Sequence, residues 1–255
     1  MSYLPEGSIG ALSYAMTLVT LVPGVLSMGG SFITILAETA NRDERGRRLN
    51  QAISLAIFLA VGSTLFLFLF GTALIQVLLE RGMFGSTDTQ LVYSALAAAS
   101  CMILPLFLMP PMDQVFQVEG RVGILVRRAL LGVVVNVLLN AWFLFGLGWG
   151  LPGIALATAL SYWVLVLFAG RAISRIGLTL DWRRHLVWTS WLFLFLLPLW
   201  PLKAFAAQAG INAWLLLAVS MAATTVLLVL AGLTFPGVER ALVQQTLRRM
   251  LGAAR

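Results

Sequence analysis

Two asparagines are the polar residues that lie deepest within the apolar segments of this sequence. Asn136 and Asn140 are four residues apart, so a helix would place both amides on one face. An amide inside a bilayer either hydrogen-bonds to a neighbouring helix or faces a hydrated cavity, and the spacing leaves both interpretations open. Such neutral groups can recognise a polar headgroup by hydrogen bonds, but they form no strong ion site.

Hydroxyl and carboxyl groups add further candidates for a substrate cavity. Tyr14, Thr17 and Thr20 lie in the first apolar block, although a helical threonine can also bond to its own backbone. Asp113 follows two prolines at the end of another block. Either it ends a helix at the membrane interface, or it lines a polar pathway, because acids within membranes are usually functional. No second acid is placed to pair with it.

The sequence predicts no enzyme, no cofactor and no metal site. Catalysis in a membrane needs paired acids, a histidine cluster, or a nucleophile beside a base. There is one histidine, His185, and its neighbours Arg183 and Arg184 suggest a solvated or headgroup-facing side chain. The single cysteine excludes an intrachain disulfide and a cysteine-based metal cluster.

The elements that must position these residues are membrane-spanning helices. Of 255 residues, 60% are hydrophobic and 11% are charged, whereas soluble domains carry about a quarter charged residues. The apolar residues form continuous blocks of roughly 20, without the alternation of a β-barrel. We therefore predict an all-α polytopic bundle of seven spans. The predicted spans are residues 8–37, 49–70, 90–112, 129–148, 153–173, 187–206 and 213–234.

The placement of basic residues predicts the orientation of the bundle. All but Arg81 and Lys203 of the 17 Lys and Arg residues fall in alternate loops and the C-terminal tail. Because cytoplasmic loops retain Lys and Arg, we place the N-terminus outside and the C-terminus inside. The net charge of +7 thus belongs to short loops, and no nucleic-acid partner is expected. The predicted cytoplasmic basic anchors are Arg42, Arg45, Arg47, Arg48, Arg127, Arg128, Arg183 and Arg184.

Prolines predict bends and a boundary. Pro23 should bend the long first block, and further prolines should bend the third and sixth spans. Residues 1–237 are predicted to form one membrane domain. Residues 238–255 are predicted to form an amphipathic helix on the cytoplasmic membrane face, with a frayed polar tail as the alternative.

Four stretches carry a family resemblance, in the order residues 4–15 (LPEGSIGALSYA), 79–84 (LERGMF), 136–140 (NVLLN) and 153–158 (GIALAT). Together they resemble the MurJ/MviN family of lipid II flippases, within the MOP flippase superfamily. That family has fourteen spans in two lobes, and this chain looks like its second lobe. After Tyr-Ala the family commonly has Asp-Arg, whereas Met16 and Thr17 stand here, so Thr17 offers a neutral hydroxyl in place of a guanidinium.

The resemblance implies a half-size flippase lobe in a bacterial inner membrane. Its partners would be membrane lipid, a polyprenyl-diphosphate-linked saccharide, and a partner lobe or a second copy. The last two spans would border a hydrophobic groove for a lipid tail. The alternatives are a non-transporting subunit or scaffold, a truncated remnant, and another exporter of polysaccharide units from the same superfamily.

Overall fold

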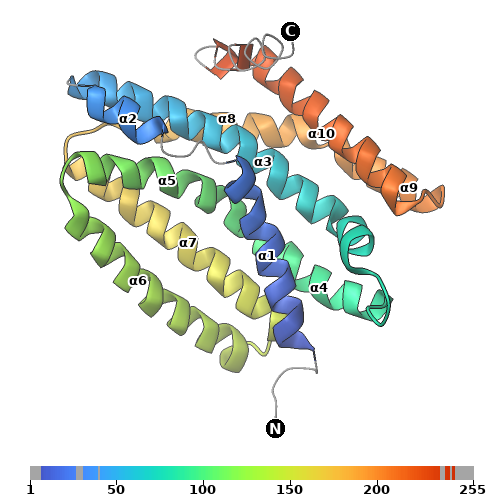
Figure 1. The fold of residues 1–255 in the computed structure, drawn as a ribbon. Coiled ribbons are helices and arrows are strands. Elements are labelled where there is room, and N and C mark those ends of the chain that lie inside the picture. The colour runs from blue at the N-terminus through green and yellow to red at the C-terminus, as the bar shows by residue number, and fades with distance from the viewer. Residues whose placement is uncertain (1–6, 27–30, 40, 236–238, 242, 245–255) are drawn as a thin grey trace.

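The computed structural model describes residues 7–26, 31–39, 41–235, 239–241 and 243–244, and these residues contain helices and no strand. Figure 1 shows the helices stacked as a slanted bundle. The elements are α1 (Ser8–Leu26), α2 (Ser31–Glu38), α3 (Arg42–Leu79), α4 (Ser86–Ala99), η1 (Ser100–Met102), α5 (Ile103–Val118), α6 (Val122–Ala141), η2 (Trp142–Gly146), α7 (Gly150–Arg175), α8 (Trp182–Leu196), α9 (Leu199–Gln208) and α10 (Ala213–Thr234). The predicted all-α fold is confirmed.

Six helical segments of the described chain are long and apolar enough to cross a membrane. They match predicted spans two to seven in order, and they make this a multi-pass membrane protein. The segments are Arg42–Leu79, Ser86–Val118, Val122–Gly146, Gly150–Arg175, Trp182–Ala206 and Ala213–Thr234.

The structure describes two helices within the first predicted span. α1 holds Pro23 and is described as far as Leu26, and α2 is a helix of 8 residues. Residues 27–30, which lie between the two helices, are outside the described residues. At 1.5 Å per residue α1 is about 28 Å long, close to the roughly 30 Å hydrocarbon thickness, so it can serve as a seventh crossing.

A proline explains the break in the third span. The residue at position 105 of a regular helix would donate its N–H to the carbonyl of Cys101, but Pro105 has no N–H to donate. The 3₁₀ turn η1 lies at this point, and the Cys101 carbonyl accepts a 3.1 Å bond from Nε1 of Trp163 on α7. By contrast, Pro110 and Pro111 lie within α5, which continues to Val118. The sixth span breaks at Pro198, between α8 and α9.

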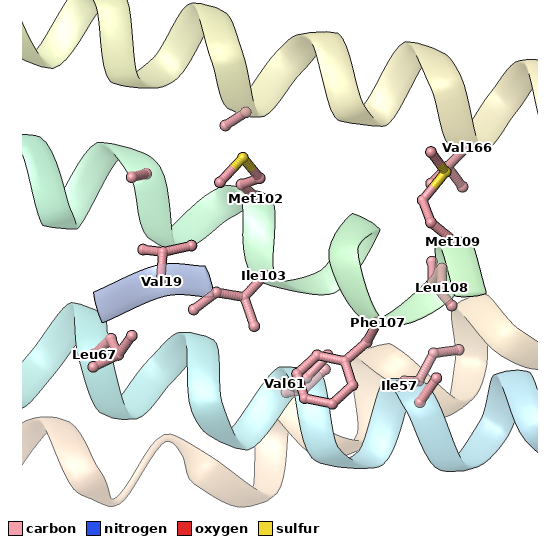
Figure 2. Packing of buried hydrophobic residues seen from close by; sticks show 14 of the residues in the cluster. Val19, Ile57, Val61, Leu67, Met102, Ile103, Phe107, Leu108, Met109 and Val166 are labelled. Carbon is pink, nitrogen blue, oxygen red and sulfur yellow. The ribbon is translucent and has the colours of Figure 1, made fainter. Parts of the chain in front are cut away.

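The long helix α3 is the centre of the bundle, since it packs against α4, α5, α8 and α10. It extends beyond the predicted residues 49–70 at both ends. Asn41 caps its start by accepting a 2.9 Å bond from the Asp43 backbone N–H, so the helix begins in the charged segment before the apolar block. Figure 2 shows Val61 of α3 and Phe107 of α5 within the buried hydrophobic cluster between these helices.

The helix α6 is held differently, because it packs mainly on α7 and has no buried residue. Figure 1 shows it at the edge of the bundle. Among its apolar side chains, Leu130, Val133 and Leu138 are each 64% exposed. Contact with lipid or with another protein surface therefore has to cover most of this helix.

The basic loops gather at one end of the bundle, which we call the basic end. Arg45 at the start of α3 pairs with Glu119 after α5, and Asn50 of α3 donates a 2.9 Å bond to the carbonyl of Thr179 between α7 and α8. Arg184 of α8 pairs with Glu239, which follows α10. The prediction that these loops share one side agrees with these contacts, while the side of the membrane that they face stays a prediction.

The predicted tail helix lies mostly outside the described residues. Residues 239–241 and 243–244 are helical, and Glu239 and Val243 are buried at 2% and 5% exposure. The start of this segment therefore packs against the bundle.

Gly170 of α7 allows a close approach that can be tested. A Cβ at this position would overlap the indole ring of Trp182, at the start of α8. We expect Gly170→Ala to lower the free energy of unfolding by about 1–3 kcal/mol relative to Gly10→Ala, which has open space around it. Both changes share the same gain in helix propensity. Unfolding in detergent, followed by tryptophan fluorescence, measures the difference; equal stabilities would contradict the packing at Gly170.

Candidate functional site

The hydroxyl candidates of the first span share one exposed face of α1. Tyr14, Thr17 and Thr20 are exposed, whereas Ala15 and Val19 on the opposite face are fully buried. Thr17 Oγ1 donates a 2.8 Å bond to the Ser13 carbonyl, and Thr20 Oγ1 donates a 2.9 Å bond to the Met16 carbonyl. The two hydroxyl hydrogens are thus used by the helix itself, while the oxygen lone pairs remain able to accept hydrogen bonds.

An aromatic contact with Phe84, at the end of the bundle opposite the basic end, positions Tyr14. Its ring meets that of Phe84, in the loop between α3 and α4, edge to face with centroids 6.1 Å apart. Such edge contacts orient aromatic rings without closing the hydroxyl from its surroundings. Tyr14 therefore presents a phenol beside the two threonines on the same helix face.

The asparagines form a network between α6 and α7. Asn136 Nδ2 donates to Thr158 Oγ1 at 3.2 Å and lies 3.5 Å from Ser161 Oγ, and Asn140 Nδ2 donates to Asn136 Oδ1 at 2.8 Å. Thr158, which belongs to the stretch 153–158, was not predicted as a site residue, and its hydroxyl completes this group. Of the two interpretations, the hydrogen bonds across the helix pair favour interhelical packing.

One acceptor in this network has no partner in the structure. The Oδ1 atom of Asn140 is buried and receives no hydrogen bond. A buried amide oxygen without a donor costs about 1–3 kcal/mol, so this network is incompletely satisfied within the described residues. The structure does not bring the asparagines to the hydroxyl face of α1, because their contacts are with α7.

Asp113 forms an ion pair with Arg128, across the turn that joins α5 to α6. The two guanidinium nitrogens contact the two carboxylate oxygens, with Nη2 donating to Oδ2 at 2.8 Å. The side chains are only 22% and 14% exposed. The turn at Gly120 lies midway between positions 113 and 128, so the two residues face each other in a helical hairpin. The partner of Asp113 is thus a base, whereas the sequence had suggested only that no second acid pairs with it.

Three of the predicted basic anchors form close ion pairs with acids of other elements. Besides Arg128, Arg45 binds Glu119 with both side chains 13% exposed, and its Nη2 donates a 2.7 Å bond to the Thr39 carbonyl. Arg184 binds Glu239, which is 2% exposed. These arginines join helices to one another, and sequence reasoning had assigned no role to either glutamate.

The other predicted anchors are more exposed. Arg42 is 67% exposed and only approaches Glu119 at 4.0 Å, and Arg48 pairs with Glu44 within α3. Arg47, Arg127 and Arg183 are exposed and have no carboxylate within 4.0 Å among the described residues. Their role as anchors stays a prediction.

The prediction for His185 was wrong. It is 3% exposed, and its Nε2 lies 2.8 Å from Oδ1 of Asn50 on α3. The beginning of α8 turns this residue toward α3, where Trp188 also donates a 3.0 Å bond to the Ser54 carbonyl. No group of three or more His, Cys, Asp or Glu residues that could hold a metal occurs within the described ranges.

Comparison with known proteins assigns the chain to a family. The family model described as "Lipid II flippase MurJ" matches residues 1–235. The chain belongs to the MurJ family. The resemblance seen in the four sequence stretches is thereby confirmed over nearly the whole chain.

Curated members of the MurJ family are similar to this chain over part of their length. The probable lipid II flippase MurJ of Rhizobium tropici is 30% identical over 189 residues, which are 72% of this chain and 34% of the relative. That of Vibrio cholerae is 26% identical over 165 residues, or 63% of this chain and 31% of the relative. The matched region thus spans about a third of each curated MurJ relative.

A solved MurJ structure has the same fold over most of this chain. The lipid II flippase MurJ in an inward closed conformation superposes with a TM-score of 0.72 and 19% sequence identity. The match covers 90% of this chain and 47% of the MurJ chain. The bundle described here is accordingly the MurJ fold over about half of that structure.

The pair Asp113–Arg128 offers a test of the link between α5 and α6. In a double-mutant cycle of Asp113→Asn and Arg128→Gln, we expect a coupling free energy of about 1–3 kcal/mol, because the pair is largely removed from solvent. The control cycle, Glu44→Gln with Arg48→Gln, concerns a pair with both side chains 41% exposed, so it should give less than about 0.5 kcal/mol. Unfolding of the detergent-solubilised variants measures both values. Similar couplings in the two cycles would show that Asp113 does not hold α6.

Proposed function

We propose that this chain forms one lobe of a flippase that moves a polyprenyl-diphosphate-linked saccharide, lipid II or a related cell-envelope precursor, across the bacterial inner membrane. The observation that carries the proposal is the structural match, which covers nearly all of this chain but about half of the solved flippase. A lobe of this kind works by rocking against a second lobe around a central substrate.

The exposed face of α1 supports a position for the substrate. A membrane helix that shows three hydroxyl groups to its surroundings is better suited to a hydrated cavity than to lipid tails. Tyr14, Thr17 and Thr20 offer oxygen acceptors, which suit the many hydroxyl donors of a saccharide. In the proposed complex this face lines the path between the two lobes, while Asn136 and Asn140 stiffen the α6–α7 pair behind it.

The second lobe is either a separate family lobe or a second copy of this chain. The broad exposed surface of α6 and the polar face of α1 both need cover that the described residues do not supply. We expect native mass spectrometry of protein extracted from cell membranes to show this chain in a complex with one further lobe. A monomer that also fails to bind a separately produced N-terminal family lobe would refute the two-lobe arrangement.

Transport can be tested on proteoliposomes that contain this complex and a fluorescent lipid-linked saccharide, with outer-leaflet exposure measured by a sugar-specific enzyme. We expect Thr17→Val to slow exposure about threefold or more, because it removes a polar contact to the substrate. Thr225→Val is the matched control, since Thr225 on α10 is also exposed and bonds to its own helix at 2.8 Å.

A non-transporting scaffold is the rival function, and the internal bonding of both α1 threonines favours it. Exposure rates that are equal in the absence and presence of the complex would support the scaffold and refute transport. A complex that moves the fluorescent substrate while unlabelled lipid II fails to compete would point to another saccharide of the same class.

A further inference from the structure

A cavity of about 650 Å³ lies at the basic end, between the α5–α6 turn, the start of α6 and the last turns of α7. Four arginines line it. Arg121 and Arg127 come from the α6 side, and Arg171 and Arg175 come from α7. Figure 1 shows α6 and α7 running side by side, so the two pairs of arginines face a common space from neighbouring helices.

The protein leaves the charge of these four arginines unbalanced. All four are exposed, and none has a carboxylate within 4.0 Å among the described residues. Arg171 and Arg175 are four residues apart on one helix face, where like charges repel each other. An anion in the cavity would relieve this repulsion.

Apolar side chains line the same cavity. Phe168 and Ala172 lie four residues apart on α7, three positions before Arg171 and Arg175 respectively, and Ile124 contributes from α6. On α7 an apolar stripe therefore runs beside a cationic stripe. A ligand that fits both must have an anionic part and a hydrocarbon part.

The cavity also lies at the depth of lipid headgroups. Arg121 and Arg127 stand around the start of the span Val122–Gly146, and Arg171 and Arg175 stand at the end of the span Gly150–Arg175. Basic pockets between helices at this depth suit phospholipid headgroups. A soluble anion would have no use for the adjoining apolar wall.

We propose that this cavity binds an acidic phospholipid, with the phosphate held by the four arginines and an acyl chain lying along Phe168 and Ile124. Guanidinium groups match phosphate oxygens with paired hydrogen bonds. A lipid with a net negative charge is preferred over a zwitterionic one, because the ammonium of a choline headgroup meets four positive charges in the cavity. The bound lipid then adds a link at the basic end between α6 and α7, two helices that already pack against each other.

The test titrates phosphatidylglycerol against the complete complex in a neutral detergent and counts bound lipids by native mass spectrometry. Arg171→Gln with Arg175→Gln should weaken binding at least about tenfold. The matched control is Arg47→Gln with Arg183→Gln, which removes the same charge from exposed arginines at the same end, and it should change binding less than about twofold. If the Arg171→Gln, Arg175→Gln variant fails to fold, Arg121→Gln with Arg127→Gln removes the two arginines on the α6 side of the cavity and should weaken binding in the same way.

Three results would overturn the proposal. The first is an equal loss of binding in the cavity and control variants, which would show diffuse attraction to the basic end. The second is phosphatidylcholine binding as tightly as phosphatidylglycerol. The third is soluble glycerol phosphate displacing the lipid at equal concentration, which would identify a site for a small soluble anion.

Discussion

The cost of leaving a charge or a backbone group unpaired in hydrocarbon governs the arrangement of this chain. Helices satisfy the backbone within each span, and the one carbonyl that Pro105 would otherwise deprive of its donor receives the indole N–H of Trp163. The same cost explains why Asp113 and Arg128 meet at the entry of α6. Polar groups in the interior are used to join helices, and most of the remaining charge is at the ends.

The polar groups of the chain fall into those that hold the helices together and those that are available to ligands. Arg45, Arg128 and Arg184 are neutralised by acids from other elements, so they belong to the framework. The hydroxyl oxygens on α1 can still accept hydrogen bonds, and the four cavity arginines have no carboxylate partner among the described residues. A substrate bound at the α1 hydroxyls and a lipid bound at the four arginines would therefore leave the ion pairs between the helices intact.

Sequence patterns predicted much of the fold, because hydropathy and charge act on whole segments. Six spans were found in order, but α3 begins before the apolar block, since a capped helix continues through charged residues at the interface. The pairing of Asp113 with Arg128 could have been predicted, because the two residues lie seven and eight positions on either side of the turn at Gly120. The role of Glu239 could not be predicted from the sequence, because its contact with Arg184 depends on where α8 and the segment after α10 pack.

His185 shows the limit of inference from neighbours in sequence. Two adjacent arginines suggested an aqueous setting, yet one turn of α8 directs the ring onto α3 while Arg183 stays exposed. The amphipathic direction of a helix start is decided by its tertiary partner. The same holds for the candidate site: the sequence could not predict that the α1 hydroxyls and the asparagines lie apart, because their separation depends on how the helices pack.

The exposure of α6 has a consequence for the synthesis of the protein. The span Val122–Gly146 has a mean hydropathy of 2.1 and none of its most apolar stretch is buried, so its hydrophobicity is enough for it to enter the bilayer before α7, the helix on which α6 packs, has been made. The segment Trp182–Ala206 has a mean hydropathy of 1.4 and more buried surface. Stable insertion of Trp182–Ala206 therefore depends more on contacts with helices that are already in the bilayer.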